Sequence, residues 1–307
     1  YGLAREVAAL FDVPLAPWPG VDPPRAGDEA PPVDVEDWEG CPRYLARLFR
    51  DVAIGPSPVW LKARVLAAGM RPISNVVDVT NYVMLALGSP LHVFDHDTLH
   101  GGVVGVRRAR DGEEVRTLDG QVRRLDHRDM VIKDGEHAIA LAAIMGGEET
   151  EIAPQTTNIL LEAANFEPIS ILHTSERLAL RTEGSNRWEK GVDPYLAEHA
   201  ARLATQLIVE TSGARWVGET DAHAALPERP RVELRPERTS ALLGLDVPAD
   251  EQRGILRRLQ FDVDGDTVTV PTWRARDVTR EEDLIEEVAR FVLDDVPFTL
   301  PPRREAI

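Results

Sequence analysis

Residues 75–95 read NVVDVTNYVMLALGSPLHVFD, and this stretch decides the fold because it joins an apolar helix to a histidine behind a Ser-Pro turn. Apolar residues recur at helical spacing and predict one buried face, formed by Val76, Val79, Val83 and Leu87. Asn75 is predicted to cap the helix at its N-terminus. Gly88 and Pro90 are predicted to end it, because glycine accepts the left-handed backbone of a helix C-terminus and proline cannot continue a helix.

The first turns of this helix also carry the polar side chains of Asp78, Thr80 and Asn81. Backbone N–H groups in the first turn of a helix lack helical partners. Together with His92 beyond the turn, these hydroxyl and amide groups could hold a polar ligand. The alternative is a capped core helix followed by a core histidine, and this stretch alone leaves both readings open.

The chain has 307 residues, of which 43% are hydrophobic, and this is enough for two domains with real cores. The net charge of −17 disfavours a general nucleic-acid binder, because phosphates repel such a surface, but it allows a local basic patch. The single cysteine, Cys41, excludes an internal disulfide and a cysteine-based zinc cage. No run approaches the roughly 18 apolar residues of a membrane helix. We therefore expect a cytoplasmic protein without a membrane partner and, because the first residue is Tyr1, a piece of a longer chain.

The pattern of apolar runs and turns divides the chain into three parts. Residues 1–39 are predicted to be an N-terminal segment followed by an extended, proline-rich linker outside the core. Residues 40–225 alternate short apolar strands with amphipathic helices and should form a mixed α/β domain. Residues 226–307 contain a strand, two helices, a hairpin and a last helix, which predicts a smaller winged-helix-like α+β domain. The predicted fold class is therefore α+β.

Several histidines and aspartates cluster after the first helix, and their spacing raises the question of a metal. Two imidazoles four residues apart on a helix are a common zinc arrangement. We nevertheless predict a solvated polar turn and no metal site, for a cluster that comprises His92, Asp95, His96, Asp97 and His100.

Glu162 lies in an otherwise apolar strand, within LLEAANF. A buried carboxylate needs a partner or a raised pKa. Glu162 is therefore either a strand-edge residue in water or a carboxylate aimed into a pocket, and the residues alone do not decide. Gly146-Gly147 follows another apolar run and could let the backbone approach a ligand, although two glycines more often make a turn.

The loop at 181–190, RTEGSNRWEK, gathers cations around Trp188 in an acidic protein. With His173 and Arg177 nearby, it could contact phosphate or a terminal base. An ordinary salt-bridged surface is the alternative.

Taken together, the chain resembles the beta subunit of bacterial phenylalanyl-tRNA synthetase over almost its whole length. The matching runs are CPRYLARL (41–48), VVDVTNYVMLALGSPLHVFD (76–95), ALAAIMGGEET (140–150), NILLEAANFEPISI (158–171), LRTEGSNRWEKGVDP (180–194) and VPTWRARDVTREEDLIEEVAR (270–290). The resemblance implies that residues 40–225 are a tRNA-editing domain, which hydrolyses tyrosine wrongly esterified to tRNA(Phe). It implies tRNA(Phe) and an alpha subunit, in a heterotetramer, as partners. ATP and magnesium belong to the aminoacylation site of the parent enzyme, so no cofactor is expected in this region.

The resemblance also implies the site residues. Its catalytic set is His92, Glu162 and Thr182, and its substrate-binding set is Thr80, Asn81, Pro90, Gly146 and Gly184. Glu162 would select the tyrosine hydroxyl, and His92 would orient water or the terminal adenosine without being a general base. Backbone N–H groups near Gly146 would polarise the ester carbonyl.

Three positions of the loop at 181–190 depart from the family pattern. Gly184 stands where many relatives have alanine, which should widen the pocket, and Asn186 and Lys190 replace a frequent histidine and arginine. A non-catalytic module that positions tRNA or braces the subunits is the main alternative function. A DNA-binding module is a weaker one, because the last 83 residues carry a net charge of −5 (13 Lys and Arg against 18 Asp and Glu).

Overall fold

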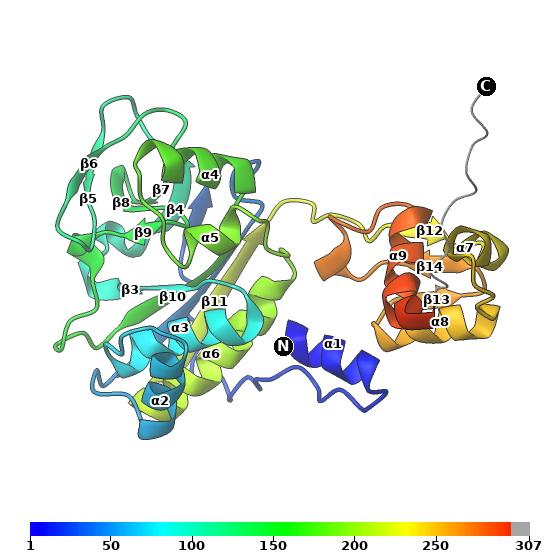
Figure 1. Ribbon diagram of the computed structural model, residues 1–307. Helices are drawn as coiled ribbons and strands as arrows, with labels where there is room; N and C mark the ends of the chain where they lie inside the picture. The colour runs from blue at the N-terminus through cyan, green and yellow to red at the C-terminus, as the bar shows by residue number, and fades with distance from the viewer. Residues whose placement is uncertain (296–307) are drawn as a thin grey trace. The chain divides into compact units, whose positions relative to one another are not determined.

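The computed structural model describes residues 1–295 and contains two compact units, each with helices and a sheet (Figure 1). The larger unit is Trp18–Leu226, and the smaller one combines Tyr1–Pro17 with the chain from Pro227 onward. The predicted α+β class is confirmed. Among the described residues, no helix has both the length and the apolar character that crossing a membrane requires.

A four-stranded antiparallel sheet forms the centre of the larger unit. Its order is β11 (Arg215–His223), β2 (Arg43–Arg50), β10 (Ile159–Asn165) and β3 (His92–Asp95). One face packs on helix α6 (Leu196–Ser212), where Leu45 and Ala163 meet Ala197 and Ala201. Side chains alternate between the faces of a strand, so the neighbours of Leu45 and Ala163 point the other way.

A second sheet of five strands lies beyond that other face. Its order is β1 (Val33–Val35), β4 (Val104–Arg108), β7 (Met130–Asp134), β8 (His137–Leu141) and β9 (Met145–Gly146), with only β1 and β4 parallel. A hairpin of β5 (Glu114–Arg116) and β6 (Val122–Arg124) adjoins it. One core cluster joins the two sheets and includes Phe94 from the first sheet and Ile132 from the second.

Helix α3 (Asn75–Leu87) is the predicted apolar helix, and its buried face contains all four predicted residues. Its end is also as predicted, because Gly88 has a left-handed φ of 85°. The predicted cap is wrong by one residue. Ser74 is the N-cap, and Asn75 instead donates to the carbonyls of Ala53 and Thr211, so its amide ties the helix to neighbouring segments.

The remaining helices of the larger unit cover its edges. They are α2 (Val59–Ala67), α4 (Pro168–Arg177) and α5 (Ser185–Trp188). Pro58 stands at the N-cap of α2, and the hydroxyl of Ser57 just before it donates to Asp78 of α3 at 2.5 Å. Asp78 therefore joins the two helices rather than facing a ligand.

The predicted linker at residues 1–39 is wrong in two respects. Residues 33–35 form β1 at the edge of the five-stranded sheet, and Val35 is buried in the core. The stretch before β1 is held by N–H groups of Ala26 and Glu29 that donate to the carbonyls of Trp216 and Val217. Proline cannot donate such bonds, but an edge segment needs only some of its N–H groups.

The smaller unit begins with the first residues of the chain. Helix α1 (Gly2–Leu10) contributes Ala9 to the same core as Val232 and Leu256, and Arg5 donates to Gln260. Residues 1–17 therefore belong with the C-terminal domain, not with the linker.

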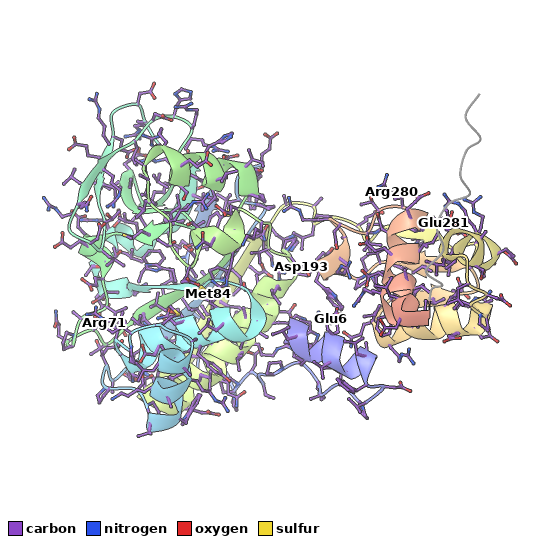
Figure 2. The ribbon with its side chains drawn as sticks, in the orientation of Figure 1. Glu6, Arg71, Met84, Asp193, Arg280 and Glu281 are labelled. Carbon is purple, nitrogen blue, oxygen red and sulfur yellow. The ribbon has the colours of Figure 1, made fainter. Side chains whose placement is uncertain are left out.

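The predicted order of strand, two helices, hairpin and helix in the smaller unit is confirmed. Its elements are β12 (Arg231–Glu233), α7 (Pro236–Leu243), α8 (Ala249–Arg258), β13 (Asp262–Asp264), β14 (Thr267–Thr269) and α9 (Glu281–Val292). Glu281, at the start of α9 and labelled in Figure 2, pairs with Arg235 and Arg238 at the start of α7. Of the predicted domain 226–307, residues 296–307 lie outside the described residues.

Candidate active site

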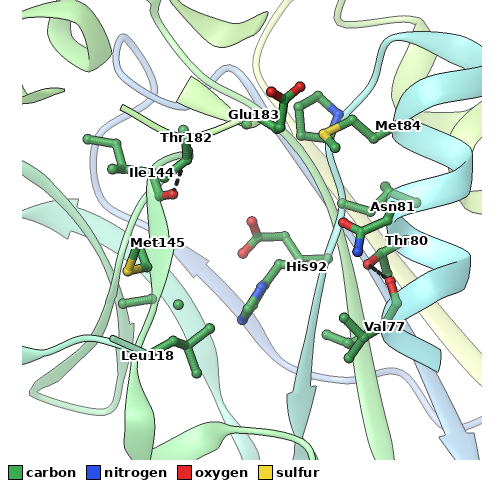
Figure 3. Close-up of a pocket in the computed structure, with 18 of the residues that line it drawn as sticks. Val77, Thr80, Asn81, Met84, His92, Leu118, Ile144, Met145, Thr182 and Glu183 are labelled. Atoms are coloured by element: carbon green, nitrogen blue, oxygen red, sulfur yellow. Dashed lines mark hydrogen bonds between the residues drawn. The ribbon is translucent and has the colours of Figure 1, made fainter. Parts of the chain in front are cut away.

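A cavity of about 510 Å³ lies in the larger unit, within the size range of small-molecule sites. Its walls come from β3, β10, the β8–β9 segment, helix α3 and the loop before α5 (Figure 3). All eight predicted site residues line it: Thr80, Asn81, Pro90, His92, Gly146, Glu162, Thr182 and Gly184. The structure therefore brings together residues that are as many as 104 positions apart in the chain.

Strand register places Glu162 and His92 side by side. In the antiparallel pair of β10 and β3, Glu162 lies directly opposite His92. Opposite residues of two paired strands share a face, and their Cβ atoms are about 5 Å apart. The carboxylate and the imidazole therefore point into the cavity from adjacent strands.

Glu162 is buried, with 6% of its surface exposed, and burial raises the pKa of its carboxyl to about 7. The hydroxyl of Tyr44 on β2 donates to Oε2 at 2.7 Å, which partly opposes this rise. Among the described residues Oε1 accepts no hydrogen bond. At the cavity, Oε2 of Glu162 thus already accepts a hydrogen bond from Tyr44, whereas Oε1 can accept one from a ligand.

His92 stands against the backbone of Gly146. A Cβ atom added at Gly146 would lie 2.5 Å from Cε1 and 2.8 Å from Nε2 of the imidazole, so only glycine leaves room for the ring. Phe94 contacts the ring edge-on, with centroids 4.5 Å apart. Burial lowers the pKa of His92 to about 4, and the imidazole is therefore neutral at pH 7.

The hydroxyls at the cavity wall already have partners. Thr182 donates to the carbonyl of Ile144 at 2.9 Å and accepts from the N–H of Ser185, and Thr80 donates to the carbonyl of Val77 (Figure 3). In this arrangement Thr182 holds the loop before α5 against the β8–β9 segment. The role of Thr182 in catalysis stays a prediction, and its contacts favour positioning.

Asn81 differs from its neighbour Thr80. Its side chain is half-buried, lines the cavity, and has no hydrogen-bond partner within residues 1–295. A carboxamide offers two donors and an acceptor. Asn81 is thus available to a polar group of a ligand.

Gly184 lies close to the segment between β8 and β9 at the cavity wall. A Cβ atom at position 184 would lie 3.3 Å from the carbonyl oxygen of Ala143 and 3.7 Å from Oγ1 of Thr182. Ala143 itself has a left-handed φ of 65°, an uncommon conformation for a residue other than glycine that the surrounding structure must hold. This strained turn brings its carbonyl to the cavity.

Comparison with known proteins gives the family. Residues 40–213, more than half of the chain, match the family model described as the B3/4 domain. The chain belongs to the B3/4 domain family. Residues 232–292 match a second model, the tRNA synthetase B5 domain, which covers most of the described C-terminal part of the smaller unit.

Curated relatives extend over almost the whole chain. The phenylalanine–tRNA ligase beta subunit of Gloeobacter violaceus is 49% identical over 98% of this chain and 39% of its own length. That of Moorella thermoacetica is 46% identical over 98% and 38%. A solved N-terminal fragment of the phenylalanyl-tRNA synthetase beta subunit from Pyrococcus horikoshii aligns over 94% of this chain and 80% of its own, at 13% identity and a TM-score of 0.42. The chain spans about two fifths of the curated relatives, and the predicted resemblance to that beta subunit is confirmed.

Tyr44, which donates to the Glu162 carboxylate, was not predicted as a site residue. In the pair of β2 and β10 it lies opposite Ala164, two residues along from the position opposite Glu162, and so on the same face. A tyrosine on the same face as a buried glutamate, in a neighbouring strand, was the available signal. It needed the strand order, which the sequence does not contain.

Of the two readings of the loop at 181–190, the structure favours the salt-bridged surface over a site for phosphate or a terminal base. Trp188 is buried with 2% exposed and packs edge-on against Phe166, so it offers no face to a base. The arginines around it pair with carboxylates: Arg177 with Asp129, Arg181 with Glu189, and Arg187 with Glu183. Residues 185–188 form the short helix α5, which turns the tryptophan inward.

The cluster of histidines after α3 separates in space. His92 faces the cavity, His96 lies 3.5 Å from Arg50, and His100 contacts Asp134 at 2.8 Å. Strand β3 and two short 3₁₀ turns replace the helix that would have aligned the imidazoles. Away from the cavity, His100, Asp134 and His137 bring potential ligand atoms within 4.8 Å of one another, and the predicted absence of a metal stays a prediction.

Proposed function

We propose that the B3/4 domain of this chain hydrolyses the ester between tyrosine and tRNA(Phe). The observation that carries the proposal is the cross-strand pair of Glu162 and His92, which presents an uncommitted carboxylate oxygen and a neutral imidazole to one cavity. The family match and the beta-subunit relatives support the choice of substrate.

Selection between tyrosine and phenylalanine follows from the physics of buried polar groups. A synthetic pocket for an apolar ring rejects an added hydroxyl only about 100-fold. The editing cavity instead favours tyrosine over phenylalanine, because Oε1 of Glu162 gains a hydrogen bond from a tyrosine hydroxyl. With phenylalanine the buried oxygen is left unpaired, which costs about 1–3 kcal/mol.

In the reaction, a water oxygen attacks the carbonyl carbon of the ester. The bond from that carbon to the ribose oxygen breaks, the ribose oxygen receives a proton that the water loses, and free tyrosine and uncharged tRNA leave. His92 orients the water or the terminal adenosine by hydrogen bonding. Its pKa of about 4 makes it a weak base at neutral pH, because efficient general bases have a pKa near the working pH.

The test measures deacylation of tyrosyl-tRNA(Phe) and phenylalanyl-tRNA(Phe) by the 307-residue chain and by Glu162→Ala. We expect the parent to favour the tyrosyl ester and Glu162→Ala to lose most of that preference. Glu149→Ala, which changes an exposed carboxylate outside the cavity, is the matched control. Unchanged discrimination in Glu162→Ala, or no turnover above spontaneous hydrolysis in the parent, would contradict the proposal.

Within the proposal, the parent protein acts with an alpha subunit in a heterotetramer in the cytoplasm, and ATP and magnesium serve its aminoacylation site rather than this cavity. The alternative of a non-catalytic module predicts the opposite outcome of the same assay. Such a module would bind the tRNA and leave both esters to spontaneous hydrolysis.

A further inference from the structure

The sequence between Asp51 and Asp78 is unusual for this protein. Residues 52–77 contain three cations and no carboxylate, within a chain of net charge −17. The three cations are Lys62 and Arg64 on helix α2 and Arg71 in the loop that follows it. Acidic chains that lack carboxylates over one stretch concentrate positive potential there.

The structure leaves these cations unneutralised. In the described part of the chain, Lys62, Arg64 and Arg71 form no ion pair with a carboxylate. Arg64 and Arg71 are exposed, and Lys62 is half-buried. The surface therefore differs from the 181–190 loop, where neighbouring acids neutralise the arginines.

Aromatic rings lie beside these cations. Trp60 of α2 contacts Tyr82 of α3 edge-on, with centroids 5.6 Å apart and an interplanar angle of 85°. The Arg64 guanidinium is 5.6 Å from the Trp60 ring and donates to the Tyr82 hydroxyl at 2.9 Å. Trp60 keeps 42% of its surface exposed. An exposed ring held beside a guanidinium is a platform on which a nucleic-acid base can stack.

The same surface runs into the cavity. Arg71 and Ile73, in the loop from α2 to α3, are exposed and also line the cavity together with Thr80 and Asn81 of α3 (Figure 2 labels Arg71). Arg71, seven residues after Arg64, therefore brings a cation of this carboxylate-free stretch to the cavity. We name Trp60, Arg64, Arg71 and Tyr82 the α2 surface.

We propose that the α2 surface binds the unpaired 3′ end of the tRNA and leads its last nucleotide to the cavity. Arg71 contacts a backbone phosphate, and Trp60 with Arg64 stacks a base. The proposal rests on the proposed function for its choice of partner. Single-stranded RNA fits better than an acidic peptide, because it alone combines regularly spaced phosphates with flat bases.

The experiment measures fluorescence anisotropy of uncharged tRNA(Phe) over a series of salt concentrations, so it does not depend on hydrolysis. Arg64→Glu/Arg71→Glu is compared with Arg110→Glu/Arg124→Glu, which changes the net charge equally at exposed arginines outside the cavity. We expect the first variant to lose affinity about tenfold and to flatten the salt dependence by a slope of about 1–2. The control should stay within about threefold of the parent, because distant exposed charges are screened.

Two further arms locate the contact. Removing the unpaired 3′ nucleotides from the tRNA should weaken binding to the parent and leave the Arg64→Glu/Arg71→Glu variant nearly unaffected. Trp60→Ala should weaken binding about fivefold or more, whereas Trp38→Ala, at a tryptophan with 40% exposed, should not. Equal losses in the two arginine variants, or no dependence on the 3′ nucleotides, would overturn the α2 surface as the RNA site while leaving the hydrolysis assay to judge the cavity.

Discussion

Neighbouring residues of β10 face two different environments. Ala163 points to helix α6 and packs among small residues with no exposed surface, whereas Glu162 points to the cavity beside His92. The close contact with α6 fixes the position of the strand. The opposite face can then carry a carboxylate whose burial costs free energy. The face of β10 that packs on α6 thus stabilises the fold, whereas the face toward the cavity carries the polar groups that can act on a ligand.

The largest effect is expected from Gly146→Ala on the cavity face. The new Cβ would lie 2.5 Å from Cε1 of His92, so the ring must move and the water it orients is lost. We expect deacylation of tyrosyl-tRNA to fall about 100-fold, since small displacements of a catalytic group have costs of this size. Gly254→Ala is the control, because nothing lies within 4 Å of its Cβ position, and wild-type turnover by Gly146→Ala would break the comparison.

On the helix face, Ala163→Leu should destabilise the protein instead. Three extra carbons must fit against Ala197 and Ala201, where there is no exposed surface, and overpacking of this kind costs about 1–3 kcal/mol. Urea unfolding of the variant should show a lower midpoint than the parent. Ala4→Leu, at an exposed position of α1, should leave the midpoint nearly unchanged. Equal midpoints for all three proteins would mean that the helix face is not close-packed.

Glu162→Gln separates stability from chemistry at one position. The folded-state pKa of Glu162, about 7, lies above the ordinary value of 4.5, so its contribution to stability is full below pH 4.5 and is lost as the pH rises to 7. Glutamine avoids this loss and can still accept from Tyr44.

The variant should therefore be more stable than the parent at pH 8, by on the order of 2 kcal/mol, and the gain should shrink towards pH 5. Urea unfolding at the two pH values measures it, and the contribution of His92 cancels because both proteins contain it. A gain that is the same at both pH values would show that the carboxylate is not buried in the folded state.

The smallest effect is expected from Gly184→Ala, at the cavity wall. The added methyl group meets the Ala143 carbonyl at 3.3 Å and has ordinary contacts otherwise. We expect a change of a few fold in the ratio of tyrosyl to phenylalanyl hydrolysis, since one methyl group in a pocket is worth about 1 kcal/mol. Stability should hardly change, because the backbone at Gly184 is already helical, with φ −67° and ψ −57°. A large loss of stability would place this glycine in the packing of the fold rather than in the cavity.

Prediction from the sequence succeeded where a local pattern has one physical solution. Helix α3 follows from the spacing of its apolar residues, and Gly88 ends it because its conformation is left-handed. The order of elements in the smaller unit followed from periodicity and turn residues. The candidate site followed from a resemblance, and the residues that it named do line one cavity.

Prediction failed where the environment of a side chain depends on distant partners. The proline-rich part of residues 1–39 was predicted to be a linker, because prolines disfavour regular structure. Residues 33–35 nevertheless form β1 and pair with β4 at the edge of the five-stranded sheet. Arginines at 177, 181 and 187 looked like a patch, and neighbouring acids neutralise them. The cations of the α2 surface were not predicted as a site, because only the structure shows that they form no ion pairs and that Arg71 lines the cavity.

Most helices and strands, and the chemical groups they carry, could be predicted from local patterns, because periodicity and turn chemistry act within a few residues. That Glu162 faces His92, that Tyr44 donates to one carboxylate oxygen, and that Trp188 is buried became visible only in the folded protein. These outcomes depend on strand order, register and packing, which arise when segments distant in the chain bury their apolar faces together.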